Sequence, residues 1–318
     1  MFIPVLRKEV SNEMENIITV ENELTLVDPQ VKAGKVFDLL DVRETTRADY
    51  KYRIAFFLDF VAGKGFNRNS FLAFKRELAE RTDLAISTKN KYLTTARVFL
   101  KELNRQGAIP ADITQNIKTF NQSKKHKKDG LTDEEINSLT QKMRQLPKDP
   151  PTTRLKAILA LLTLQGLRQI EIIRLDIKDL DFIGKTALIQ GKGQDDKELI
   201  NLHPETCKTL QEYLKTNKIA DRALFTSQSN NNKNKRLTTR ALRGIVKGYL
   251  NTLGIDKTTH GFRHYFTTKL IKTYKGDLLE VAQYTRHKSL EMLQVYNDNI
   301  KRQADLPRYY ETFKGVTF

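Results

Sequence analysis

The C-terminal half of this 318-residue chain contains basic and imidazole side chains at spacings suited to chemistry on an anion. Arg168 opens a predicted helix, and Lys192 lies in a tight turn between two predicted strands. His260 and Arg263 are three residues apart, which places both side chains on one face of a helix. Arginine binds phosphate oxygens through pairs of parallel hydrogen bonds, so the group indicates a site for phosphate.

A tyrosine and a histidine complete this group of reactive side chains. His287 comes nine residues before Tyr296. A tyrosine hydroxyl has a reference pKa near 10 and needs help to lose its proton before it can attack phosphorus. Taken singly, each residue has an ordinary interpretation, as a surface arginine or lysine, a helix-capping histidine or a core tyrosine. Only the combination supports a prediction.

Other kinds of site are not indicated. The turn at 191–193, Gly-Lys-Gly, is too short for a phosphate-binding loop, and neither an H-E-x-x-H motif nor a carboxylate cluster with metal-nuclease spacing occurs. The single cysteine, Cys207, excludes an intrachain disulfide and argues against a cysteine-based metal site. We therefore expect neither a metal ion nor a cofactor.

The charge balance indicates a polyanionic partner. The chain has 55 Lys and Arg against 38 Asp and Glu, a formal net charge of +17. Such an excess favours nucleic-acid binding, although a merely lysine-rich protein would share it. The N-terminus lacks the apolar stretch of a signal peptide, and we expect a cytoplasmic, nucleoid-associated protein that does not bind a membrane.

The hydrophobic pattern predicts two domains that are mainly α-helical. Residues 1–35 have weak periodicity and are interpreted as an N-terminal arm. Residues 36–122 are predicted to form a helical bundle with three helices and a short fourth one from Pro110. A basic linker covers 123–130, SKKHKKDG, and the second domain covers 131–318. This domain begins with a capping box, Thr132 to Glu135, and contains a small antiparallel sheet from strands near 180–182, 187–189 and 198–202.

The order of the motifs resembles the tyrosine recombinases, which include the phage integrases and the Xer recombinases. The resemblance covers about residues 40–300 and depends on the segments GLRQIEIIRL, HGFRHYFTT and RHKSLEMLQVY and on the strand-turn-strand with GKG. The N-terminal bundle is similar to that family's core-binding domain. It implies the tyrosine recombinase fold, a helical core-binding domain followed by a mixed catalytic domain, closing on DNA as a C-shaped clamp.

The resemblance implies seven catalytic positions, namely Arg168, Glu171, Lys192, His260, Arg263, His287 and Tyr296. The two arginines would bind the nonbridging oxygens and stabilise the transition state electrostatically. Lys192 would protonate the leaving 5′-oxygen, and His287 would donate a hydrogen bond to the phosphate. His260 is either the base or a phosphate-binding group. Tyr296 would form a 3′-phosphotyrosine that a 5′-hydroxyl can reverse.

Several positions leave alternatives open. Arg286 stands where the family often has glycine, and its side chain either assists binding or points away. The turn after Gly193 is one residue longer than common versions, so Lys197 is the alternative acid. Tyr309 and Tyr310 are rival nucleophiles by residue type. His264, which follows the second arginine, is assigned no role.

The sequence thus predicts a site-specific recombinase, for a mobile element or for chromosome-dimer resolution, acting on double-stranded DNA. Alternatives are a type IB topoisomerase-like enzyme and a catalytically inactive DNA-binding regulator. The family resemblance implies four protomers on two DNA sites, with a possible partner recombinase, and the C-terminal segment either closes its own domain or docks on a neighbour. Backbone phosphate contacts are expected from a set of lysines chosen by charge, which are Lys89, Lys91, Lys124, Lys125, Lys127 and Lys128.

Overall fold

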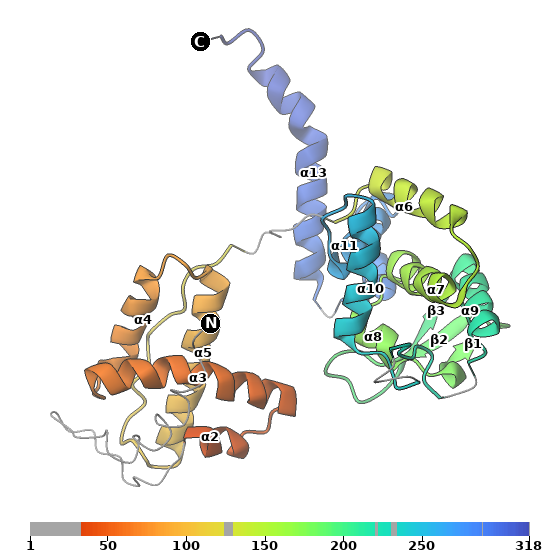
Figure 1. The fold of residues 1–318 in the computed structure, drawn as a ribbon. Helices are drawn as coiled ribbons and strands as arrows, with labels where there is room; N and C mark the ends of the chain where they lie inside the picture. The colour runs from red at the N-terminus through yellow and green to blue at the C-terminus, as the bar shows by residue number, and fades with distance from the viewer. Residues whose placement is uncertain (1–32, 124–129, 220–221, 230–233, 288, 318) are drawn as a thin grey trace. The chain divides into compact units, whose positions relative to one another are not determined.

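The computed structural model describes residues 33–123, 130–219, 222–229, 234–287 and 289–317. The chain divides into two compact units, Met1–Ser123 and Lys124–Phe318 (Figure 1). The described elements are helices apart from one small antiparallel sheet in the second unit, so the predicted fold class is confirmed. The division falls at the basic segment that the sequence indicates as a linker.

The first unit is a helical bundle around an aromatic core. Its elements are α2 (Ala33–Val36), the short 3-10 turn η1 (Phe37–Leu39), α3 (Glu44–Lys64), α4 (Ser70–Glu80) and α5 (Ile86–Arg105). Phenylalanines from different elements meet in the interior, where Phe57 packs edge-on against Phe74 with ring centroids 5.1 Å apart. Such aromatic pairs add to the free energy of burying apolar area, which stabilises the bundle.

The fourth helix expected from Pro110 does not form, and that prediction is wrong. Residues 113–116 make a turn instead. The Asp112 carboxylate accepts hydrogen bonds from both the backbone N–H and the hydroxyl of Thr114. Asn116 has a φ of 60°. Farther on, the Asn90 amide pairs with the backbone of Phe120 and holds this segment against α5. Aspartate and asparagine compete with a helix in this way by bonding to nearby backbone.

The second unit contains the remaining elements. Its helices are α6 (Asp133–Gln145), α7 (Pro150–Leu164), α8 (Gln169–Arg174), η2 (Ile177–Asp179), α9 (Pro204–Asn217), α10 (Thr239–Thr252), α11 (Thr259–Thr273), α12 (Leu278–Thr285) and α13 (Leu290–Thr312). The predicted capping box at Thr132 and Glu135 is confirmed. Within the described residues, no helix combines the length and the apolar character that crossing a membrane requires.

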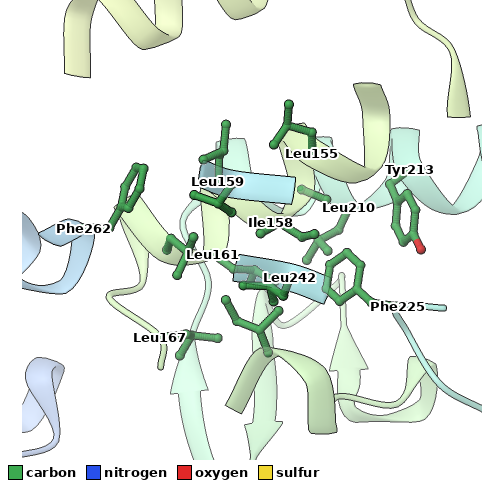
Figure 2. Close-up of a cluster of buried hydrophobic side chains, with 14 of the residues drawn as sticks. Leu155, Ile158, Leu159, Leu161, Leu167, Leu210, Tyr213, Phe225, Leu242 and Phe262 are labelled. Carbon is green, nitrogen blue, oxygen red and sulfur yellow. The ribbon is translucent and has the colours of Figure 1, made fainter. Parts of the chain in front are cut away.

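Helix α7 forms the centre of this unit, and Figure 2 shows its side chains surrounded by neighbouring elements. Its segment 155–162 is apolar on nearly every side, as expected for a helix buried all round. Phe262 of α11 and Tyr213 of α9 pack on it from different directions. Because α7 ends at Leu164, this packing fixes the position of the next few residues, where the candidate site begins.

The sheet pairs β1 (Leu180–Asp181) with β2 (Thr186–Ile189) and β2 with β3 (Glu198–Asn201), all antiparallel. Along β2, Ala187 and Ile189 face the core whereas Leu188 is exposed, which is the alternation of a sheet with one buried face. The connection from β2 to β3 holds Lys192. The sheet thus fixes both ends of the turn that carries this lysine.

Helix α13 has a buried start and an exposed end. Leu293 packs with Ile271 of α11 and Val281 of α12, and Tyr296 and Ile300 lie at the edge of this small cluster. From 301 to 317 nearly every side chain is exposed, and the helix projects from its own unit (Figure 1). The C-terminal segment therefore does not close its own domain within the described residues.

Candidate active site

The turn between α7 and α8 holds the first arginine. Gly166 has a φ of +58°, and a Cβ there would lie 2.3 Å from Cδ1 of Phe266, so this close approach requires glycine. Arg168 then caps α8. Its backbone N–H donates to Glu171 Oε2 at 2.8 Å, and its Nη1 donates to Oε1 at 2.7 Å. The buried Glu171 therefore fixes both the backbone and the guanidinium of Arg168.

Helix α11 contributes the second arginine and two histidines. Arg263 is 3% exposed, and it donates through Nη1 to the carbonyl of Gly166 at 2.7 Å and through Nη2 to the carbonyl of Thr285. Burial, together with the charges of Arg168 and Arg286, lowers the pKa of Arg263 to about 10. The guanidinium remains charged at neutral pH. It joins α11 to the turn after α7 and to the end of α12.

The turn that carries Lys192 is held in place by α8. Arg174 Nη1 donates to the carbonyl of Gly191 at 2.8 Å, and Gly193 has a φ of +79°. Lys192 is exposed and lines two cavities next to Arg168. The alternative acid, Lys197, forms an ion pair with the buried carboxylate of Asp179 instead. The geometry therefore favours Lys192 as the lysine of this site.

Arg286 points into the site rather than away from it. It ends α12 in the left-handed conformation, with φ 54° and ψ 43°, and its side chain is 7% exposed. Nη1 donates to the carbonyl of Tyr284 at 2.9 Å, and Nη2 lies 3.4 Å from Glu171 Oε2. Two arginines, Arg168 and Arg286, thus share one buried carboxylate. The side chain of Arg286 therefore does not point away, and its assistance in binding stays a prediction.

Replacing Arg286 with glycine is expected to slow DNA cleavage about 10- to 100-fold, since Glu171 would be held from one side only and a small misplacement of catalytic groups costs that much. Glycine also suits the left-handed backbone, so the melting temperature should not fall for backbone reasons. Lys218→Gly is the matched control, because Lys218 ends α9 with φ 50° and ψ 42°. Equal cleavage rates in both variants would contradict the prediction.

His287 follows Arg286, and its hydrogen bonds define its tautomer. Thr285 Oγ1 donates its only proton to the carbonyl of Val281 at 2.9 Å, so it must accept from His287 Nδ1 at 2.8 Å. In the neutral ring Nε2 then has no proton. The ring can donate through Nε2 to a phosphate, as the sequence prediction requires, only as an imidazolium, which the negative charge of a phosphate would favour.

The stability of the protein should depend on pH through His287. Burial, followed by the charges of Arg263, Arg168 and Arg286, lowers its pKa to about 3 from an ordinary 6.5. As pH falls below 6.5 the unfolded chain takes up a proton that the folded protein refuses, so this site loses stability down to about pH 3. In His287→Asn the melting temperature should therefore fall less between pH 7 and pH 4.5. Parallel curves for the two proteins would refute this.

Tyr296 reaches the site from α13. Its hydroxyl forms a hydrogen bond with Nδ1 of His264, and the two ring centroids are 5.3 Å apart. Burial raises the pKa of Tyr296 to about 12, while Arg263 acts in the opposite direction. The sequence prediction assigns His264 no role. A signal that could have identified it is its spacing, because His264 lies four residues after His260 and therefore on the same helix face.

Six of the seven predicted catalytic residues line two adjoining cavities. A cleft of about 700 Å³ is lined by Arg168, Glu171, Lys192, Arg286 and His287, and a cavity of about 400 Å³ by Arg168, Lys192, His260 and Arg263. Tyr296 joins them through His264, whose ring packs edge-on against that of His260. The rival tyrosines are on the exposed end of α13, at Tyr309 and Tyr310. The arrangement can bind an anion and present a hydroxyl near it.

The lysines predicted to contact DNA have different outcomes. Lys89 is 6% exposed, and its Nζ donates to the carbonyl of Ala79 at 2.9 Å. It holds α5 against α4, so its prediction as a phosphate contact is wrong. Lys91 is exposed on the same helix. The four linker lysines, Lys124, Lys125, Lys127 and Lys128, lie outside the described residues.

Comparisons with known proteins agree with this fold. The model of the phage integrase family matches residues 130–303, more than half of the chain. The tyrosine recombinase XerC of Herpetosiphon aurantiacus is 28% identical over 264 residues, covering 79% of this chain and 83% of that protein. XerD of Lacticaseibacillus casei is 26% identical over 241 residues, covering 72% and 77%.

Solved structures of recombinases share the architecture. The XerH recombinase bound to a palindromic difH substrate, in a post-cleavage complex, matches with a TM-score of 0.69 at 18% identity and covers 95% of this chain and 93% of that one. A lambda integrase (75–356) dimer bound to a COC′ core site matches with a TM-score of 0.64 at 13% identity, covering 83% and 92%. With the family match over the catalytic unit, the conclusion is that this chain belongs to the phage integrase family of tyrosine recombinases.

Proposed function

We propose that this recombinase cleaves and rejoins DNA at a specific site through a 3′-phosphotyrosine on Tyr296. The observation that carries the proposal is the cleft in which Arg168, Lys192 and His287 converge, with Arg263 and the Tyr296–His264 pair beside it. Attack on a phosphodiester adds negative charge to the nonbridging oxygens. Preorganised guanidinium groups stabilise that charge as it develops.

The energy of the phosphodiester bond is conserved during the reaction. Tyrosine replaces the 5′-oxygen on phosphorus, and the lysine supplies the proton that the leaving 5′-oxygen requires. A new 5′-hydroxyl can then displace the tyrosine, since the phosphodiester energy remains in the protein–DNA bond. No nucleotide cofactor is needed for this exchange. Cleavage should therefore persist in EDTA, because the cations that act on the phosphate are side chains.

The proposed substrate is double-stranded DNA with a recombination site for a mobile element or for chromosome-dimer resolution. The net charge of +17 supports extensive contact with phosphates, and Lys91 remains a proposed contact. We expect binding to weaken steeply with salt as counterions are released. The helical unit and the catalytic unit are proposed to close on the duplex, in a tetramer of four protomers on two sites. The exposed end of α13 supports docking on a neighbouring protomer.

The test uses DNA flanking the gene, built as a nicked substrate that traps the covalent product. The expected result is a denaturation-resistant adduct that forms equally well with EDTA present. Loss of the adduct on chelation would argue for a different mechanism. A supercoiled plasmid that lacks the site is tested alongside the nicked substrate. Relaxation of this plasmid at the same rate would favour the topoisomerase alternative, and tight binding with no adduct on any flanking DNA would favour the inactive regulator.

A further inference from the structure

His264 and Tyr296 meet in a place that solvent reaches poorly. His264 is 6% exposed on α11, and its Nδ1 forms the hydrogen bond with the Tyr296 hydroxyl. The tyrosine ring is held by the apolar cluster of α11, α12 and α13, which includes Leu293 one turn earlier on its own helix. Both ends of the hydrogen bond are therefore fixed by packing. A titratable ring is positioned on the hydroxyl that the proposed reaction uses.

The tyrosine needs a proton acceptor more than an ordinary tyrosine does. Burial raises its pKa to about 12, and the opposing effect of Arg263 does not cancel this. At pH 7 only about one molecule in 10⁵ would hold the phenolate, since each pKa unit is a factor of ten. Attack at a useful rate thus requires that a base takes the proton as the bond to phosphorus forms.

His260, the other candidate base, is placed differently. It is exposed and lines the smaller cavity together with Arg168 and Arg263. Its ring stands edge-on to the ring of His264, with centroids 4.6 Å apart and an interplanar angle of 87°. The two histidines are one helical turn apart on the same face of α11. One is on the side of the arginines, and the other is on the side of the nucleophile.

We propose that His264 accepts the proton of Tyr296 during attack and that His260 binds the phosphate; this rests on the proposed function. The O–H bond of Tyr296 breaks as its proton passes to Nδ1, and the oxygen forms its bond to phosphorus. The bond from phosphorus to the 5′-oxygen breaks, and that oxygen takes a proton from Lys192. Religation reverses each transfer. Nδ1 must start unprotonated, so the neutral ring of His264 has its proton on Nε2.

The charges around His264 and Tyr296 disfavour the proton transfer in the free protein and favour it once DNA is bound. The Arg263 guanidinium, next to His264 in the chain, acts on both Tyr296 and His287, and the ring of His260 stands edge-on to that of His264. A positive charge on His264 would be repelled by that guanidinium. The bound phosphate brings negative charge to the same place as the proton moves. The proton transfer is consequently favoured once DNA is bound. This restricts phenolate formation to the complex with substrate.

The experiment compares His264→Asn with His260→Asn and the wild type in single-turnover cleavage of the nicked substrate. Asparagine places an amide near the position of Nδ1, so it can accept the hydrogen bond but cannot take the proton. We expect the rate of adduct formation by His264→Asn to fall by roughly 10²- to 10⁴-fold, with unchanged DNA binding and little change in melting temperature. Its rate should recover roughly tenfold per pH unit, because hydroxide can replace the missing base.

A second substrate separates the nucleophile from the leaving group. Sulfur in place of the bridging 5′-oxygen leaves without a proton, so it should restore cleavage by Lys192→Ala, the control for a lost acid. It should not restore cleavage by His264→Asn. Restoration of both variants would place His264 on the leaving group, and wild-type cleavage by His264→Asn would reduce its role to holding the hydroxyl. Either result overturns the inference while the proposed function stands, whereas a wild type that forms no adduct overturns both.

Discussion

Replacing Tyr296 with phenylalanine is expected to abolish the covalent adduct and to leave DNA binding intact. The substitution removes only the hydroxyl, while the ring keeps its place in the apolar cluster beside Leu293 and Ile271. The lost hydrogen bond leaves Nδ1 of His264 without this partner and should cost about 1 kcal/mol of stability. End-labelled nicked DNA, resolved on a denaturing gel after reaction, measures the adduct, and a gel shift measures binding.

Tyr309→Phe and Tyr310→Phe are the controls for that experiment. Both side chains are on the exposed end of α13, where their rings pack on each other. Each variant should form the adduct at the wild-type rate on an isolated site. An adduct that survives in Tyr296→Phe and disappears in Tyr310→Phe would move the nucleophile to the end of the helix. The assignment of Tyr296 as the nucleophile would then be wrong.

The substitution Arg263→Lys is expected to reduce cleavage by roughly 10²- to 10³-fold, which is the effect of losing one preorganised donor to the transition state. Lysine keeps the positive charge but cannot donate to two carbonyls at once in a fixed fork. Arg263 does this with Gly166 and Thr285, so the substitution should also cost about 1–3 kcal/mol of unfolding free energy. Single-turnover cleavage and thermal unfolding, measured on the same preparation, give both quantities.

Arg154→Lys distinguishes catalysis from stability. Arg154 is 9% exposed on α7, and its Nη1 donates to the carbonyl of Thr226 at 3.2 Å, so it is also a buried arginine bonded to backbone. Burial lowers its pKa as well. This variant should lose stability and still cleave DNA. If cleavage falls in both variants in proportion to stability, the effect of Arg263 is structural only.

Local signals predicted much of the second unit. The capping box at Thr132 and Glu135, the helix that opens at Arg168 and the three short strands depend on neighbours within a few residues, and each was confirmed. The pairing of Arg168 with Glu171 across one helical turn is local too. Such features follow from backbone hydrogen bonding and side-chain size, which the sequence displays directly.

The features that the sequence could not predict depend on tertiary packing. Lys89 was chosen as a DNA contact by charge, yet it donates a hydrogen bond to a carbonyl of α4, and only the packing of two helices places it there. Arg286 turns inward because α12 ends next to Glu171, 115 residues earlier in the chain. The contact of His264 with Tyr296 likewise joins two helices through folding. Charge and spacing do not determine such contacts.

The three guanidiniums around Glu171 have a practical consequence for anyone who handles this protein. Arg168, Arg263 and Arg286 place three positive charges around Glu171, with Glu198 as a further negative charge at the cleft, and the guanidiniums disfavour one another. A small dianion such as sulfate that enters this cleft relieves the repulsion, and ligands that bind only the folded state stabilise it. The same ion would take the place proposed for the DNA phosphate. A sulfate buffer that stabilises the enzyme in this way is therefore expected to compete with DNA for the cleft.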